Sequence, residues 1–150
     1  MNDAIRHLDQ RFEHFRSLSG FSRPPKGWLR AIRDALGMTT AQFGRRIGVS
    51  QPRAVAIEKA EISGAITLHS LERAAEALGC RLVYALVPER PLSEIVQTRA
   101  ESLARQTLSA VDQTMMLEDQ AVHPKAVRKE MLDKLIMELL QNPARLWDQS

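Results

Sequence analysis

The chain has 150 residues, of which 44% are hydrophobic and only 5% aromatic, so it can bury a core built mainly from aliphatic side chains. Its single cysteine, Cys80, excludes a disulfide framework and a CxxC metal or redox site. No apolar run reaches the roughly 18 residues of a membrane-spanning helix, so no membrane partner is expected. The first residues lack the apolar stretch of a signal peptide, which makes the cytoplasm the expected location.

The net charge of +3 is distributed unevenly. Residues 23–80 carry nine Lys/Arg against five Asp/Glu, whereas residues 81–150 carry nine against ten. This pattern suggests an anionic partner for the central region and protein contacts for the C-terminal one. The four histidines are scattered without HExxH spacing, and no Walker, GxGxxG or GxSxG motif occurs. We therefore expect no catalytic residue, metal site or cofactor, and the chain is not expected to be an enzyme.

The first elements are expected to be two helices separated by a linker. Residues 2–19 have the apolar period of an amphipathic helix, carried by Ile5, Leu8, Phe12 and Phe15. The consecutive prolines Pro24-Pro25 cannot lie inside a helix. Residues 26–36 predict a second helix, which ends at Gly37. Its apolar side chains Leu29, Ile32 and Leu36 are expected to face the core.

Three short helices are predicted next, because each begins with a capping residue and ends at a glycine. Thr39-Thr40-Ala41-Gln42 has the pattern of a capping box, and Gly48 ends the helix that it starts. Ser50 caps a helix over about 51–60, and Thr67 caps another that reaches about Leu78.

The pattern changes at residue 80. Alternating β-branched and aromatic residues predict one short strand, formed by Arg81, Leu82, Val83, Tyr84, Ala85, Leu86 and Val87. The sequence offers no second strand, so the expected pairing partner is the same strand of a second copy, in a homodimer. Helical period returns over 92–119 and again from Pro124 to about Gln141, around a loop at 121–123. These two helices are expected to pack together. They would either extend the dimer or bind a partner, or else merely cover the helix-turn-helix core.

The segment from Thr39 to Glu61 carries the functional signal. Two short helices joined by a tight turn need a small residue at their closest approach and a glycine in the turn, and Gly44 and Gly48 fit these places. Phe43, Ile47 and Val49 are expected to contact Ala54 and Ile57 across the pair. This is the pattern of a DNA-binding helix-turn-helix.

The block resembles the Cro/repressor-type (XRE) helix-turn-helix class, with residues 28–78 as its helical core. Val49-Ser50-Gln51 resembles the start of that class's recognition helix, and Ile57-Glu58 resembles its end. Ala54 stands where the class usually has a branched residue. Ala56 stands where it often has a polar, base-reading one.

The resemblance implies that the first turns of the recognition helix contact base edges in the major groove. Gln51 can bond adenine, Arg53 can bond guanine, and Ala56 can offer a methyl group to thymine; the expected base-contacting residues are Gln51, Pro52, Arg53 and Ala56. Phosphate contacts are expected at the N-terminus of the preceding helix and near the end of the recognition helix, from Thr39, Thr40, Gln42 and Lys59. Arg45 and Arg46 are expected on the flank.

The flanking segments add a second resemblance. Residues 2–19, CRLVYALVPERPL and the tail with Thr114-Met115-Met116-Leu117-Glu118 are similar to the mobile mystery protein A family, over nearly the whole chain. That resemblance implies a Fic-domain protein encoded alongside. Fic inhibitors share a Ser/Thr-x-x-x-Glu-Gly/Asn motif, which Thr114 and Glu118 match and from which Asp119 departs.

The sequence therefore predicts a mostly α fold with a Cro/repressor-like helix-turn-helix core, one short strand and a two-helix extension. The expected segments are 1–24 (helix and linker), 25–80 (helix-turn-helix domain), 81–90 (strand and linker) and 91–150 (helical extension). The expected function is a sequence-specific regulator that binds double-stranded DNA as a homodimer and represses its own operon. The alternative is an antitoxin-type protein-interaction module that inhibits a Fic-domain toxin.

Overall fold

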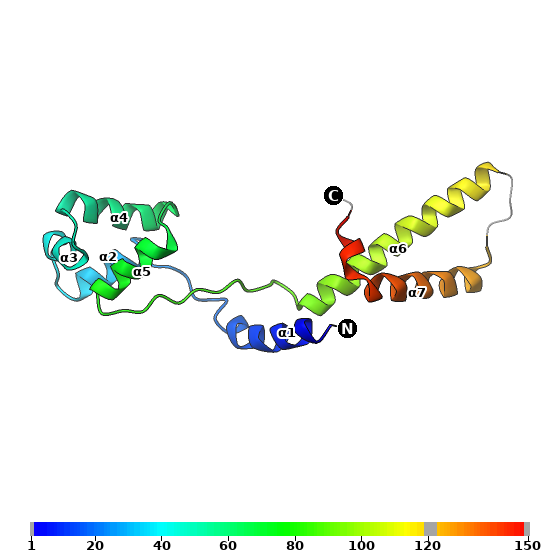
Figure 1. Cartoon of the computed structure of the whole chain (residues 1–150), viewed down its shortest axis with the longest axis horizontal. Helices are drawn as coiled ribbons and strands as arrows, with labels where there is room; N and C mark the ends of the chain where they lie inside the picture. The colour runs from blue at the N-terminus through cyan, green and yellow to red at the C-terminus, as the bar shows by residue number, and fades with distance from the viewer. Residues whose placement is uncertain (1, 119–122, 149–150) are drawn as a thin grey trace. The chain divides into compact units, whose positions relative to one another are not determined.

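A computed structural model describes residues 2–118 and 123–148 of the chain. These residues form seven α-helices and one short 3-10 helix (Figure 1), so the predicted mostly α fold is confirmed. Among the described helices, none combines the length and the apolar character needed to cross a bilayer. Asp119 and the first two residues of the predicted loop at 121–123 lie outside the described residues.

The chain divides into two compact units. The central unit, Leu18–Leu86, contains α2 (Trp28–Ala35), α3 (Thr40–Ile47), α4 (Gln51–Ser63) and α5 (Leu68–Ala77). The terminal unit combines the residues up to Ser17 with those from Val87 onwards, and contains α1 (Asp3–Arg16), α6 (Leu92–Leu117), α7 (Lys125–Gln141) and the 3-10 helix η1 (Pro143–Leu146).

Local capping signals set the helix boundaries of the central unit. The predicted capping box of α3 is confirmed: the Gln42 amide N–H donates to Thr39 Oγ1 at 3.2 Å, and the Thr39 amide N–H donates to Gln42 Oε1 at 2.8 Å. Ser50 and Thr67 cap α4 and α5 by accepting the backbone N–H groups of Arg53 and Ser70 at 3.3 and 3.1 Å, without the reciprocal bond of a capping box. However, α4 runs on to Ser63, beyond the predicted end near residue 60, because its helix stop is Gly64.

The core of the central unit is the predicted contact between α3 and α4, closed by α2 and α5. Its buried side chains are Leu29, Phe43, Ala54, Ile57, Ala74 and Leu78, with Ile47 and Val49 packed against them. The prediction that Leu36 faces inward is wrong, since its side chain is 57% exposed. Because α2 ends at Ala35, Leu36 is the C-cap residue and no longer follows the helical period.

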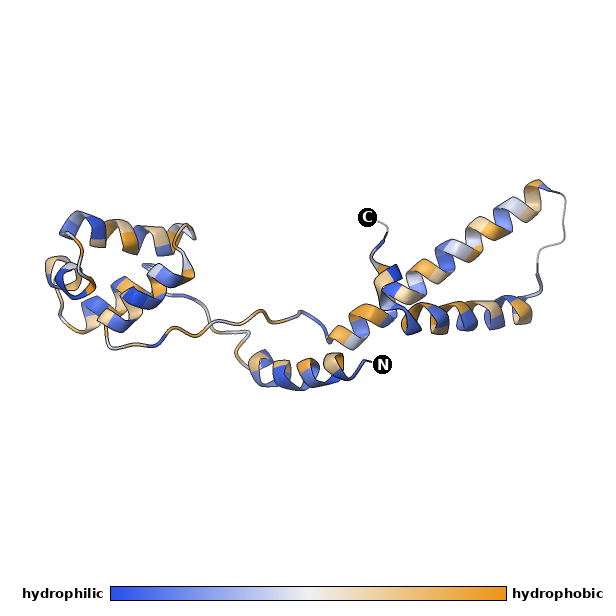
Figure 2. Cartoon of the chain, in the orientation of Figure 1, coloured by the Kyte–Doolittle hydropathy of each residue, from blue (hydrophilic) through white to orange (hydrophobic). Residues whose placement is uncertain are grey.

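A separate apolar cluster holds the terminal unit together. Ala100 and Ala104 of α6 are fully buried against Leu139 of α7 and Leu146 of η1. Figure 2 shows hydrophobic bands alternating with hydrophilic ones along α6 and α7, as expected for helices buried on one side. The sequence did not predict η1, because four residues are too few to show a helical period. This short helix is held in place by the burial of Leu146.

The first helix belongs to the terminal unit through a long-range cap. Asp9 of α1 accepts the Leu92 and Ser93 amide N–H groups at 2.6 and 3.1 Å, at the start of α6, where the N-cap residue Pro91 supplies no side-chain cap. Burial disfavours the charged form of Asp9, but these hydrogen bonds outweigh it, and the pKa of Asp9 lies below its ordinary value. The carboxylate thus satisfies helix-terminal amides that α6 leaves open.

The predicted strand is wrong for the single chain. Residues 80–88 are described throughout and contain no strand. Most of these side chains lie in solvent, with Tyr84 70% and Leu86 86% exposed. A strand needs a neighbouring strand for its backbone hydrogen bonds, and the described residues of one chain offer none.

Candidate nucleic-acid interface

The helix pair α3–α4 has the close approach that its glycines predict. A Cβ atom at Gly44 would lie 2.9 Å from the Val49 carbonyl oxygen, so only glycine allows α3 to pass this close to the turn. Gly48 adopts the left-handed conformation, with φ 85°, and ends α3. Both residues therefore play the parts that the helix-turn-helix pattern assigned to them.

The helix α4 has one face fixed in the protein and one face in solvent. Its buried residues, Ala54, Ile57, Glu58 and Glu61, recur every three or four positions and so form one stripe. Two of these four are acids, and a buried carboxylate needs a partner because desolvation is costly. Each of them is bound to a residue distant in sequence.

Glu58 forms a buried ion pair with Arg33 of α2. The Arg33 Nε–H group donates to Glu58 Oε1 at 2.5 Å, and the two side chains are only 9% and 8% exposed. The same guanidinium donates to the Met38 carbonyl oxygen at 2.8 Å, so it ties together α2, α4 and the start of the turn before α3. Its hydrogen bond with Glu58 raises the pKa of Arg33 above its usual range, although burial opposes this.

Glu61 caps the N-terminus of α2. Its two carboxylate oxygens accept the backbone N–H groups of Trp28 and Leu29 at 2.7 and 3.0 Å. The N-cap residue of α2 is Gly27, which has no side chain to do this. Arg23 in turn donates to the Glu61 and Ile62 carbonyl oxygens at 2.7 and 3.0 Å, at the end of α4. The opposite helix termini of α2 and α4 are therefore satisfied together.

The first turn and the solvent-facing side of α4 present the predicted base-contacting residues. Gln51, Pro52, Arg53 and Ala56 are all exposed, and so is Lys59, a predicted phosphate-contacting residue. The side chains of Gln51, Arg53 and Lys59 have no hydrogen bond or ion pair within the described part of the chain. Because Ala54, Ile57 and the two acids fix the backbone, these exposed side chains are carried on a rigid helix whose polar groups remain available for an external ligand.

The N-terminus of α3 brings together the predicted phosphate-contacting residues. Thr39 and Gln42 are exposed and Thr40 is half-buried. In the capping box, Thr39 Oγ1 and Gln42 Oε1 act as acceptors. The Thr39 hydroxyl hydrogen and the Gln42 NH2 group are thus left as donors, which is the character that a phosphate oxygen requires.

The basic residues of the central region fall into two groups. Five of them bind acids or helix-terminal carbonyls inside the unit: Arg23, Arg30, Arg33, Arg46 and Arg73. In particular, Arg46 of α3 donates to the Ala77 carbonyl oxygen at the end of α5, and Arg73 of α5 donates to the Ile47 carbonyl oxygen at the end of α3. The other four, Lys26, Arg45, Arg53 and Lys59, have no such contact among residues 23–80, all of which are described.

Arg45, which the sequence placed only on the flank of the helix-turn-helix, is a further candidate phosphate ligand. It lines a shallow depression of about 510 Å³ beside α3, together with Gln42 and Arg46. Because Arg46 is bound to α5, Arg45 is the cation of this depression that remains available. Arg45 and Arg46 are adjacent and cannot be distinguished by sequence. The hydrogen bond to the Ala77 carbonyl oxygen makes Arg46 a structural residue and leaves Arg45 as the candidate phosphate ligand.

The remaining predicted site residues lie in the terminal unit. Thr114 is exposed on α6, and its hydroxyl donates to the Ala110 carbonyl oxygen at 3.0 Å. Glu118 is the C-cap residue of the same helix and is also exposed. The two therefore lie one turn apart at the end of α6.

In a comparison with known families, residues 29–84 match the family model described as Helix-turn-helix. The matched range runs from the second residue of α2 to the end of α5 and into the extended residues that follow. The predicted helix-turn-helix domain is thus confirmed, whereas the resemblance to the mobile mystery protein A family is not confirmed. Comparisons with curated proteins and with solved structures find no match.

Proposed function

We propose that this protein is a sequence-specific DNA-binding transcriptional regulator that reads DNA with the exposed face of α4. The observation that carries the proposal is the division of α4 into two faces. One face is fixed to α2 by Glu58 and Glu61, and the exposed first turn presents Gln51 and Arg53 with unengaged side chains.

Docking of a helix-turn-helix gives each group a role. The N-terminal turns of α4 lie in the major groove, where Arg53 bonds O6 and N7 of guanine and Gln51 bonds N6 and N7 of adenine. Ala56 and Pro52 present only apolar atoms to the groove, and these suit the thymine methyl group. Thr39, Gln42, Arg45 and Lys59 bind phosphates on either side, while the half-buried Thr40 contributes its backbone amide at the start of α3.

Binding to a randomised DNA pool, followed by sequencing, tests this function. We expect one motif to be enriched. Arg53→Ala should then weaken binding to the selected sequence by about 1–3 kcal/mol and relax the preference at one base pair. Arg105→Ala is the matched control, because Arg105 is also an exposed arginine, and it lies on α6, where it pairs with Glu101 one turn away. Equal effects of the two substitutions, or no enriched motif, would contradict the proposal.

We propose further that the regulator acts as a homodimer on its own operon. One recognition helix spans only a half-site, and helix-turn-helix dimers read two half-sites about 34–36 Å apart. The selected motif should accordingly be a two-fold repeat with this spacing, and it should occur upstream of the gene. Loss of reporter repression after Arg53→Ala, with repression kept after Arg105→Ala, is the expected result in cells.

An antitoxin that binds a Fic-domain protein is the second candidate. The observation that favours a protein-binding role is the exposed end of α6, where Met116 and Leu117 are 66% and 88% exposed beside Thr114 and Glu118. Co-expression with the product of the adjacent gene tests it. Copurification that Glu118→Ala reduces and Arg53→Ala leaves unchanged would support this function, and the absence of any complex would exclude it.

A further inference from the structure

The apolar stripe of α6 is covered over its first half and bare over its second. Val96, Ala100 and Leu103 pack into the cluster formed with α7 and η1. The same stripe continues through Thr107, Ala110 and Thr114, at alternating steps of four and three residues, but these side chains are exposed. A groove of about 510 Å³ runs along this part of the helix and is lined by seven residues of α6 between Leu103 and Met115.

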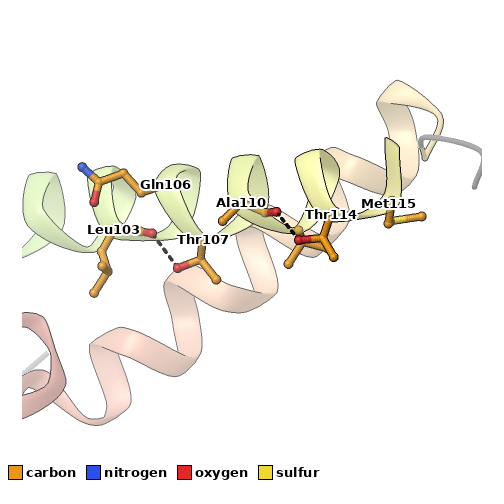
Figure 3. A pocket seen from close by; sticks show the side chains of 7 residues that line it. Leu103, Gln106, Thr107, Ala110, Thr114 and Met115 are labelled. Atoms are coloured by element: carbon orange, nitrogen blue, oxygen red, sulfur yellow. Dashed lines mark hydrogen bonds between the residues drawn. The ribbon is translucent and has the colours of Figure 1, made fainter. Parts of the chain in front are cut away.

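The hydroxyl groups in this groove do not make it polar. Thr107 Oγ1 donates to the Leu103 carbonyl oxygen at 2.9 Å, and Thr114 Oγ1 donates to the Ala110 carbonyl oxygen at 3.0 Å (Figure 3). Each threonine therefore uses its hydroxyl hydrogen within the helix, as a residue in the middle of a helix commonly does. Between the two threonines, Ala110 leaves room for the backbone of another helix to approach closely.

The same part of α6 is almost without charge. From Gln106 to Leu117 the only ionisable residue is Asp112, and its carboxylate is paired with Arg128 of α7 at 2.7 Å and is 14% exposed. In contrast, seven of the 17 residues of α7 are charged. Depletion of charge around small and apolar residues is typical of the buried centre of a protein interface and unusual for a solvent-exposed helix face.

We propose that this groove is the dimer interface, in which α6 packs antiparallel against α6 of a second copy. The choice of a second copy rests on the proposed function, because a two-fold operator needs two recognition helices. The stripe is also self-complementary. When a two-fold axis passes between Thr107 and Ala110, these two residues oppose each other across the interface, and Leu103 opposes Thr114.

This register pairs the flanking residues as well. Gln106 and Gln113 occupy the same side of the stripe, seven residues apart, so an antiparallel partner places Gln106 of one copy beside Gln113 of the other. A primary amide carries both donors and an acceptor, and two amides can therefore bond each other in both directions. No like charges meet across the axis, since all the residues that line the groove are uncharged.

Sedimentation of the full chain without DNA tests whether the interface exists. We expect dimers at micromolar concentration. Ala110→Arg should produce monomers, because the long charged side chain enters the centre of the groove, whereas Ser109→Arg at the neighbouring exposed position should leave dimers. A monomeric wild-type chain, or dimers that survive Ala110→Arg, would overturn the proposal, even if another protein were found to bind this face.

A charge exchange tests the register. In the double variant Gln106→Glu/Gln113→Lys, opposite charges meet in the two symmetric contacts on either side of the two-fold axis. In Gln106→Lys/Gln113→Lys, like charges meet in the same two contacts. We expect the first to dimerise at least about tenfold more tightly than the second, with a difference that shrinks in high salt. Equal dissociation constants would show that these positions do not meet. Because no DNA is present, failure of the dimer and failure of DNA binding are measured separately.

Discussion

Replacing Glu58 with alanine removes one half of the ion pair that fixes the recognition helix to α2. The Arg33 side chain, which is 9% exposed in the intact protein, would lose the carboxylate oxygen that now lies 2.5 Å from its Nε. Loss of one partner of a buried pair costs about 3–5 kcal/mol. Arg33 keeps Asp34 and the Met38 carbonyl oxygen as partners, both at 2.8 Å, so the lower end, about 3 kcal/mol, is expected.

Amide hydrogen exchange of α2 and α4 in the full chain measures this loss. A cost of about 3 kcal/mol corresponds to roughly 150-fold faster exchange of the amides that exchange through opening of the central unit. The control is Arg30→Ala, which breaks the 3.7 Å pair between Arg30 and Asp34. Both of these side chains are 48% exposed, so about 0–1 kcal/mol is expected.

A rescue variant separates the charge from the packing. Arg33→Met/Glu58→Leu replaces the pair by apolar side chains of similar size, a change that is often neutral or stabilising. We expect it to restore slow exchange. If Glu58→Ala behaves like Arg30→Ala, or if the double variant exchanges as fast as the single one, the ion pair does not hold α4 in place.

Three further outcomes follow from the described contacts. Gly44→Ala should destabilise the central unit by about 1–3 kcal/mol, since its Cβ would lie 2.9 Å from a backbone oxygen; Gly20→Ala, with open space around it, should leave the melting temperature within about 1 °C. Asp9→Asn should speed exchange at the start of α6. Because the native pKa of Asp9 is lowered, its stabilisation is complete above about pH 4 and is lost as the pH falls through that lowered pKa, so the two proteins should converge in acid. Leu146→Ala should cost about 2–5 kcal/mol in exchange of α6 and α7, because the side chain is fully buried; faster exchange confined to η1 would contradict this.

The sequence by itself determined the elements of the helix-turn-helix. Thr39, together with Gln42, and Ser50 cap the starts of two helices, and Gly48 ends one; each of these signals acts over three or four residues. The closeness of α3 to the turn was predictable for a similar reason, since Gly44 and Val49 are only five residues apart in sequence. The exposure of Pro52, Arg53, Ala56 and Lys59 follows from the helical period once the buried stripe is known. Gln51 is in line with the buried Ala54 and Glu58, and it is exposed in the first turn of the helix.

The tertiary structure decided which charged residues are structural and which elements exist beyond the local signals. Glu58 and Glu61 bind partners 25 to 33 residues away, and Arg46 binds a carbonyl 31 residues away, so no short pattern separates them from solvent-exposed charges. Residues 81–87 have the composition of a strand, but a strand also needs a neighbouring strand, and composition does not supply one. The order of η1 depends on the burial of Leu146 against Ala100, Ala104 and Leu139, which α6 and α7 bring together. Local hydrogen bonds are encoded where they form, whereas burial and ion pairing are properties of residues brought together by the fold.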